Sequence, residues 1–193
     1  MPLNGAFFSG DKMDLLYECA KNYEELTKYN FTLTLNCGLD IDIIFKPVSF
    51  FHLMGLHKLT DIAQLTNSKN PTLTYKNILN GRITQDVIEK SQYYYQIKER
   101  LEKFVDIDNI LKSKIIIDFD YRLTPGASSK IMAKYILFKS YSDTNVHLCF
   151  KLDTKTQNYY SPETFIVQAS DYYIKNQVVY EVVNITKTPY KRK

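Results

Sequence analysis

The pattern of apolar and polar positions gives the first half of the chain a largely helical character. Residues 11–29 carry apolar side chains at three- and four-residue spacing, which predicts an amphipathic helix. Residues 31–36 and 40–45 alternate apolar and polar positions on either side of Gly38, which predicts a β-hairpin. Further helices are predicted over residues 50–59, 73–79 and 84–104.

From residue 114 onward the apolar positions recur with a period of two, which is typical of strands. Strands are predicted over residues 114–120, 133–140, 145–152, 164–169 and 178–186. Helices followed by a run of strands predict an α+β fold. We expect N-terminal helices and the hairpin to pack on a four- or five-stranded antiparallel sheet.

The composition of the chain is that of a single globular domain. The chain has 193 residues, of which 45% are hydrophobic and 24% charged, so it can bury a substantial core. No internal repeat or linker divides it. We therefore predict a single domain over residues 1–193, with a core from about 10 to 186 and a basic tail at 187–193.

The cysteines and the N-terminus indicate the cellular compartment in which we expect the protein. Cys19, Cys37 and Cys149 are odd in number, widely scattered and without a CxxC pair, which favours free thiols over disulfides or a zinc site. The N-terminus lacks a secretory pattern, and no segment reaches transmembrane length. We expect a cytoplasmic protein with no membrane partner.

Charge is distributed unevenly along the chain. The net charge of +4 divides into −3 over residues 1–50, +2 over 51–112 and +5 over 113–193. The chain also contains sixteen tyrosines and eleven phenylalanines, but no tryptophan. A basic, tyrosine-rich C-terminal half favours an anionic partner, although solvated surface lysines explain the same charge.

The stretch 45–61, FKPVSFFHLMGLHKLTD, holds two of the three histidines, His52 and His57, with Lys58 beside them. Histidine next to lysine suits acid–base chemistry on a phosphate. On a continuous helix a spacing of five residues separates the histidines by about 140°. This predicts that one faces the core and the other a cleft, and it argues against a metal site built on the pair. In the alternative interpretation His52 is a core residue and His57 with Lys58 ends the helix.

A second group of candidate residues lies on the predicted strands. His147 and Lys151 share one face of strand 145–152, Lys139 lies on the neighbouring strand, and Thr164 opens the next one. Ammonium groups, a hydroxyl and an imidazole on one sheet face would form a cradle for a phosphodiester. The alternative is that all four are ordinary surface residues of strands.

Established motifs for nucleotide binding, serine hydrolysis and zinc binding are absent from the sequence. Asp118 and Asp120 on one strand leave open a metal-dependent nuclease. Without a confirming pattern, we expect neither a metal nor another cofactor.

Two short motifs resemble a known family. FHLMGLHKL at residues 51–59, after a strand ending in Phe45-Lys46, and SPETFI at 161–166 resemble a phage- and mobile-element-associated group of predicted nucleases. This group belongs to the barnase–EndoU–colicin–RelE-like superfamily, and the resemblance spans about residues 10–186. It implies N-terminal helices on an antiparallel sheet and metal-independent cleavage of RNA, often by toxins.

The resemblance also implies a mechanism, in which a ribose 2′-OH attacks the adjacent phosphate. It implies His52 as general base or acid, with His57 as the alternative. Lys58 or Lys139 would stabilise the phosphate, and Thr164 would donate a hydrogen bond to it.

Partners follow from the same resemblance. We expect RNA, either tRNA or another single-stranded nucleic acid, held by Lys139, His147 and Lys151, together with an antitoxin or a host protein. The rival hypothesis is a non-catalytic phage accessory or inhibitor protein. It would use the basic C-terminal half to bind nucleic acid or a protein partner without cleaving anything.

Overall fold

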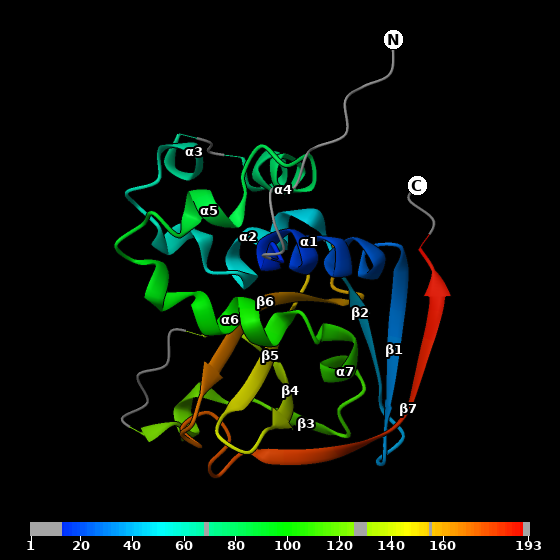
Figure 1. Cartoon of the computed structure of the whole chain (residues 1–193). Helices are drawn as coiled ribbons and strands as arrows, with labels where there is room; N and C mark the ends of the chain where they lie inside the picture. The colour runs from blue at the N-terminus through cyan, green and yellow to red at the C-terminus, as the bar shows by residue number, and fades with distance from the viewer. Residues whose placement is uncertain (1–12, 68–69, 126–130, 155, 191–193) are drawn as a thin grey trace.

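The strands close into a barrel, and the helices gather mostly over one side of it (Figure 1). The computed structural model describes residues 13–67, 70–125, 131–154 and 156–190. The strands are β1 (Tyr29–Leu35), β2 (Asp40–Ile44), β3 (Ile115–Asp118), β4 (Tyr135–Ser140), β5 (Asn145–Leu152), β6 (Tyr160–Gln168) and β7 (Val178–Pro189). All of the strands predicted from the alternation are present, with shifted ends.

Most helices are shorter than predicted, whereas α4 (Pro71–Leu79) begins two residues earlier than the helix predicted over 73–79. The helices are α1 (Leu15–Leu26), α2 (Pro47–Leu53), η1 (Leu56–Lys58), α3 (Ala63–Thr66), α4 (Pro71–Leu79), α5 (Gln85–Ile88), η2 (Tyr94–Gln96), α6 (Lys98–Phe104), α7 (Ile107–Leu111) and η3 (Tyr121–Leu123). Asp14 caps α1 by accepting a hydrogen bond from the backbone N–H of Tyr17. No helix in the described part of the chain has the length and apolar composition needed to cross a membrane.

The single long helix predicted over residues 84–104 is wrong, because a distant carboxylate interrupts it. The Asp61 side chain accepts hydrogen bonds from the Ser91 hydroxyl, at 2.5 Å, and from the Gln92 backbone N–H, at 2.9 Å. These bonds hold a turn between α5 and η2. Helical periodicity persists across the turn, which is why the sequence alone predicted one helix.

The predicted open antiparallel sheet is also wrong, because the strands form a closed, mixed barrel in the order β1-β2-β6-β5-β4-β3-β7. Strand β7 is twelve residues long, and it pairs first with β3 and then with β1. One parallel pair, Ile43 with Tyr160, joins β2 to β6. The hairpin is therefore part of the barrel, and Lys187–Pro189 extend β7. The rest of the predicted tail, residues 191–193, lies outside the described residues.

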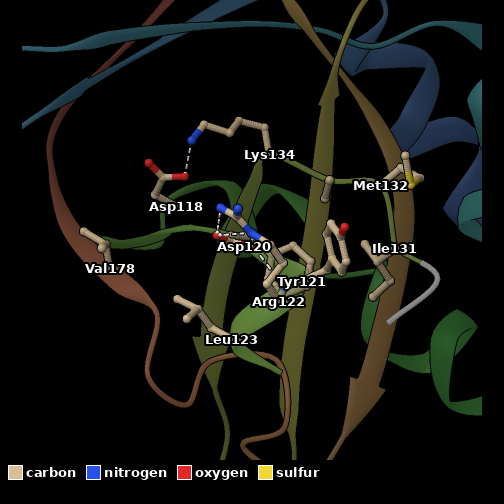
Figure 2. Close-up of a pocket in the computed structure, with 11 residues that line it drawn as sticks. Asp118, Asp120, Tyr121, Arg122, Leu123, Ile131, Met132, Lys134 and Val178 are labelled. Carbon is tan, nitrogen blue, oxygen red and sulfur yellow. Dashed lines mark hydrogen bonds and ion pairs between the residues drawn. The ribbon is translucent and has the colours of Figure 1, made fainter. Parts of the chain in front are cut away.

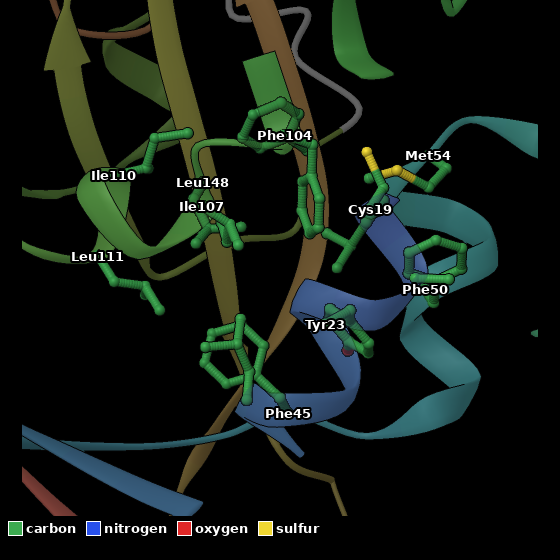
Figure 3. Close-up of a cluster of buried hydrophobic side chains, with 14 of the residues drawn as sticks. Cys19, Tyr23, Phe45, Phe50, Met54, Phe104, Ile107, Ile110, Leu111 and Leu148 are labelled. Atoms are coloured by element: carbon green, nitrogen blue, oxygen red, sulfur yellow. The ribbon is translucent and has the colours of Figure 1, made fainter. Parts of the chain in front are cut away.

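Tyr23 on α1 lies at the centre of the core between the helices and the barrel (Figure 3). Its ring contacts the rings of Phe45, Phe50 and Phe104, with centroid distances between 5.3 and 6.2 Å. Its hydroxyl donates a hydrogen bond of 2.8 Å to the carbonyl oxygen of Lys46. Aromatic packing of this kind holds α2 against α1 and α6. It thereby also fixes the position of the histidine stretch, which includes α2.

Candidate active site

The two histidines of the 45–61 stretch lie side by side at the protein surface. Helix α2 ends at Leu53, and Gly55 then adopts a left-handed conformation with φ of +72° before η1 begins. This turn brings His57 back to His52, so that their ring centroids are 5.2 Å apart. Both side chains are exposed. The prediction that they face different directions is wrong, because it assumed an uninterrupted helix.

Gly55 is required by its contacts as well as by its backbone conformation. A Cβ atom at this position would lie 2.9 Å from Cγ2 of Ile97 and 3.5 Å from Cδ of Arg100. A left-handed residue without a Cβ therefore lets the turn approach α6 closely. The approach places Arg100 next to the histidine stretch.

Arg100 and Lys58 form a cationic cluster with the two histidines. The Arg100 guanidinium is partly buried and donates a hydrogen bond of 3.4 Å to the carbonyl oxygen of Leu53. Lys58 is also partly buried. Among the residues that the structure describes, neither forms an ion pair with a carboxylate. The acidic residue nearest to Lys58 in sequence, Asp61, accepts hydrogen bonds from Ser91 and Gln92 instead.

The charges of this cluster act on one another. Partial burial of the His57 ring, together with smaller effects of the positive charges of His52, Arg100 and Lys58, lowers the pKa of His57 to about 4. Burial and the charge of Arg100 together lower the pKa of Lys58. His57 is therefore neutral at pH 7 and able to accept a proton. An anion bound here would relieve the repulsion among the cations.

The charge of Arg100 also acts on two residues, Cys149 and Tyr173, at the face of the barrel that carries Thr164. Burial raises the pKa values of Cys149 and Tyr173, and the charge of Arg100 opposes both increases. Thr164 is the direct cross-strand partner of Cys149, so their side chains share a face. Thr164 is half-buried beside a shift in the strand register, a feature common near active sites.

The two predicted strand lysines are engaged elsewhere. Lys139 donates a hydrogen bond of 3.1 Å to the carbonyl oxygen of Asn109, and its ammonium lies 5.6 Å from the centroid of the Tyr141 ring. The ammonium of Lys151 is 3.6 Å from a carboxylate oxygen of Glu163. In the described ranges, no contact brings either lysine to the histidine pair.

His147 is completely buried, so the prediction that it lies on an open sheet face is wrong. Its face of the barrel is covered by a second apolar cluster around Phe119 and Ile136, and its ring packs against Phe138 and Tyr173. Neither ring nitrogen has a hydrogen-bond partner. Burial lowers the pKa of His147 to about 4, with a smaller opposing effect from the backbone of Ile166. A ring enclosed in this way cannot contact a substrate.

The burial of His147 predicts an effect on stability. Replacing His147 by leucine should raise the free energy of unfolding by about 1–3 kcal/mol at pH 7, because two unsatisfied polar atoms are removed. The wild type should also lose roughly 3 kcal/mol as the pH falls from 6.5 to 4, since only the unfolded state gains the proton at this residue. Urea denaturation of both proteins between pH 4 and 8 tests this, and an equal acid sensitivity in the leucine variant would contradict it.

The aspartates considered as metal ligands are paired with cations. Asp118 interacts with Lys134, and Asp120 with Arg122 at 2.5 Å, along a surface pocket of about 560 Å³ (Figure 2). Across the described ranges, no three histidine, cysteine or acidic side chains gather as a metal site would require. These carboxylates stabilise the pocket wall through ion pairs.

Arg100 and Tyr173 are the residues of this site that the sequence analysis missed. Arg100 lies on the same helical stripe as Ile97 and Phe104, both of which are buried. A charged residue within an apolar stripe was therefore the available signal. Tyr173 carried none, because it is one of sixteen tyrosines and lies between two predicted strands.

Comparison with known proteins identifies the family of the chain. The family model described as PBECR4, phage-Barnase-EndoU-ColicinE5/D-RelE like nuclease4, matches residues 15–193. No curated protein and no solved structure matches the chain. The match confirms the resemblance seen in the two short motifs, and it covers both of them.

Proposed function

The chain belongs to the PBECR4 family of phage-Barnase-EndoU-ColicinE5/D-RelE like nucleases, and from this premise we propose that it is a metal-independent endoribonuclease. One observation carries the proposal: a histidine pair, 5.2 Å apart, lies beside Lys58 and Arg100. Among the described residues, no carboxylate neutralises these two cations. Two imidazoles can exchange protons, while unpaired cations can bind a phosphodiester and stabilise charge that develops on it.

The proposed reaction uses the two histidines in different protonation states. Neutral His57 takes the proton from the ribose 2′-OH, and the 2′-oxygen forms a bond to phosphorus. The bond from phosphorus to the 5′-oxygen breaks, and protonated His52 donates a proton to that oxygen. The products are a 2′,3′-cyclic phosphate and a 5′-hydroxyl. We assign Arg100 and Lys58 the role of stabilising the negative charge of the phosphorane. Thr164 is assigned as a further hydrogen-bond donor to it.

The lowered pKa of His57 predicts the pH dependence of cleavage. His57 can act as a base only when neutral, so the acidic limb of the kcat/KM profile should have its midpoint near the pKa of His57 in the free enzyme, about 4. An unperturbed histidine would place this midpoint near 6.5. Cleavage of a short oligoribonucleotide between pH 3.5 and 8 measures it, with circular dichroism confirming the fold at each pH. A midpoint at or above 6.5 would remove His57 as the base.

The direct test of the function is incubation of the protein with total RNA, with and without EDTA, followed by analysis of the ends. We expect EDTA-resistant cleavage that leaves cyclic phosphates. Cleavage abolished by EDTA would overturn the metal-independent mechanism. Salt-sensitive binding without any product would instead support the non-catalytic binding protein.

We propose further that the protein acts in the cytoplasm on RNA, consistent with a toxin of a phage or mobile element. Expression in a host tests this part: a toxic nuclease should select for loss-of-function mutations at His52 or His57. The antitoxin or host-protein partner stays a prediction from the family resemblance.

A further inference from the structure

A pocket of about 330 Å³ opens directly beside the histidine pair. His52 and His57 form part of its wall, and the remaining wall comes from α2, η1, α3 and the first residue of α4. Leu56, Leu59, Leu65 and Pro71 make most of that remaining wall apolar. The pocket therefore continues the proposed catalytic site into an apolar recess.

Three rings lie together along this wall. The ring centroid of Phe51 is 5.7 Å from that of His52 and 6.4 Å from that of His57, and the histidine rings are 5.2 Å apart. Phe51 is only partly buried, so part of its ring remains accessible. The rings are tilted to one another, by 86° between Phe51 and His52 and by 45° between the histidines, so a flat aromatic ligand can stack on the accessible face of one of them.

Besides the two histidines, few polar groups line the pocket. The Thr66 hydroxyl donates a hydrogen bond of 3.2 Å to the carbonyl oxygen of Ile62, which leaves its oxygen able to accept a bond from a ligand. The charges of Lys58 and Arg100 act on His57, but neither residue is part of the pocket wall. An aromatic, apolar recess next to a separate cationic cluster matches a nucleotide, whose base is flat and whose phosphate is anionic.

We propose that this pocket binds one unpaired nucleobase of the RNA, on the nucleotide adjacent to the phosphate that is cleaved. The inference rests on the proposed function for the position of that phosphate. The volume accommodates a single base, and a base must be unpaired and unstacked to enter such a recess, so the substrate class is single-stranded RNA or an unpaired loop. Because Thr66 offers a single acceptor, the preference among bases is modest.

Binding of mononucleotides tests the pocket without depending on cleavage. Nucleoside 3′-monophosphates should bind at least about 10-fold more tightly than ribose 5-phosphate in calorimetry, because only they stack on Phe51. Thr66→Trp should abolish this difference by filling the pocket. The matched control is Gln64→Trp, on an exposed residue of the same short helix that does not line the pocket. Equal binding of both ligands by the wild type, or equal effects of the two variants, would overturn the inference.

Cleavage gives a second readout that separates this inference from the proposed function. A wild type that cuts a single-stranded oligoribonucleotide at least about 10-fold faster than its duplex, with the excess lost in Phe51→Leu, supports the base pocket. Equal cleavage of both forms would retain the nuclease and overturn the pocket. Tighter mononucleotide binding with no cleavage of any RNA would retain the pocket and overturn the nuclease.

Discussion

Replacing His52 by alanine should lower RNA cleavage by roughly 100- to 10,000-fold, because the proton donor for the leaving 5′-oxygen is lost. The barrel should remain folded, since the His52 side chain is exposed and α2 is anchored by the buried Phe50 and Leu53. Single-turnover cleavage of an oligoribonucleotide measures the loss, and thermal unfolding followed by circular dichroism checks the fold.

The matched control for His52→Ala is His147→Leu, which removes a histidine that is completely buried away from the site. Its cleavage rate should stay close to that of the wild type. If His52→Ala cleaves RNA at the wild-type rate, His52 has no part in the reaction. If both variants lose activity together, the effect comes from the fold and not from the chemistry.

Replacing Arg100 by glutamine should lower cleavage by roughly 100- to 1,000-fold, the loss expected when one preorganised donor to a developing oxyanion is removed. Glutamine removes the charge, and its amide nitrogen is two bonds shorter than Nη1, so the hydrogen bond to the Leu53 carbonyl is lost as well. The matched control is Lys98→Gln, which makes the same charge change on an exposed position of the same helix. The control should retain nearly full activity.

Arg100→Gln also allows a second measurement, the pH profile of cleavage, which a purely structural role of Arg100 would leave unchanged. Because the Arg100 charge helps to lower the pKa of His57, its removal should move the acidic limb of the pH profile upward, from near 4 toward 6.5. The Lys98 variant should leave the limb in place. A loss of activity with an unshifted limb would mean that Arg100 does not act on the histidine electrostatically.

These predictions depend on residues that approach each other only in the fold. Arg100 and Gly55 are 45 positions apart, and the missing Cβ of Gly55 avoids a clash with Ile97, so that the turn between the histidines can pack against α6, which carries Arg100. The turn pairs His52 with His57, and the guanidinium supplies charge to the pair. The acid–base and phosphate-binding parts of the proposed site thus depend on a single close contact between η1 and α6.

The sequence by itself determined the features that follow from local periodicity. The alternation of apolar residues predicted the hairpin and every strand, and three- and four-residue spacing predicted α1. The two short motifs identified the family, and the 45–61 stretch identified the candidate site. Each of these signals is contained within neighbouring residues, which is why a single chain was enough to read them.

The tertiary structure alone decided the features that depend on distant partners. Asp61 broke the helix predicted over 84–104, and β7 closed the barrel by pairing with both β3 and β1. The left-handed Gly55 joined the histidines, and a second apolar cluster buried His147. Hydrogen bonds and packing between segments far apart in sequence set these outcomes, and no periodicity along the chain encodes them.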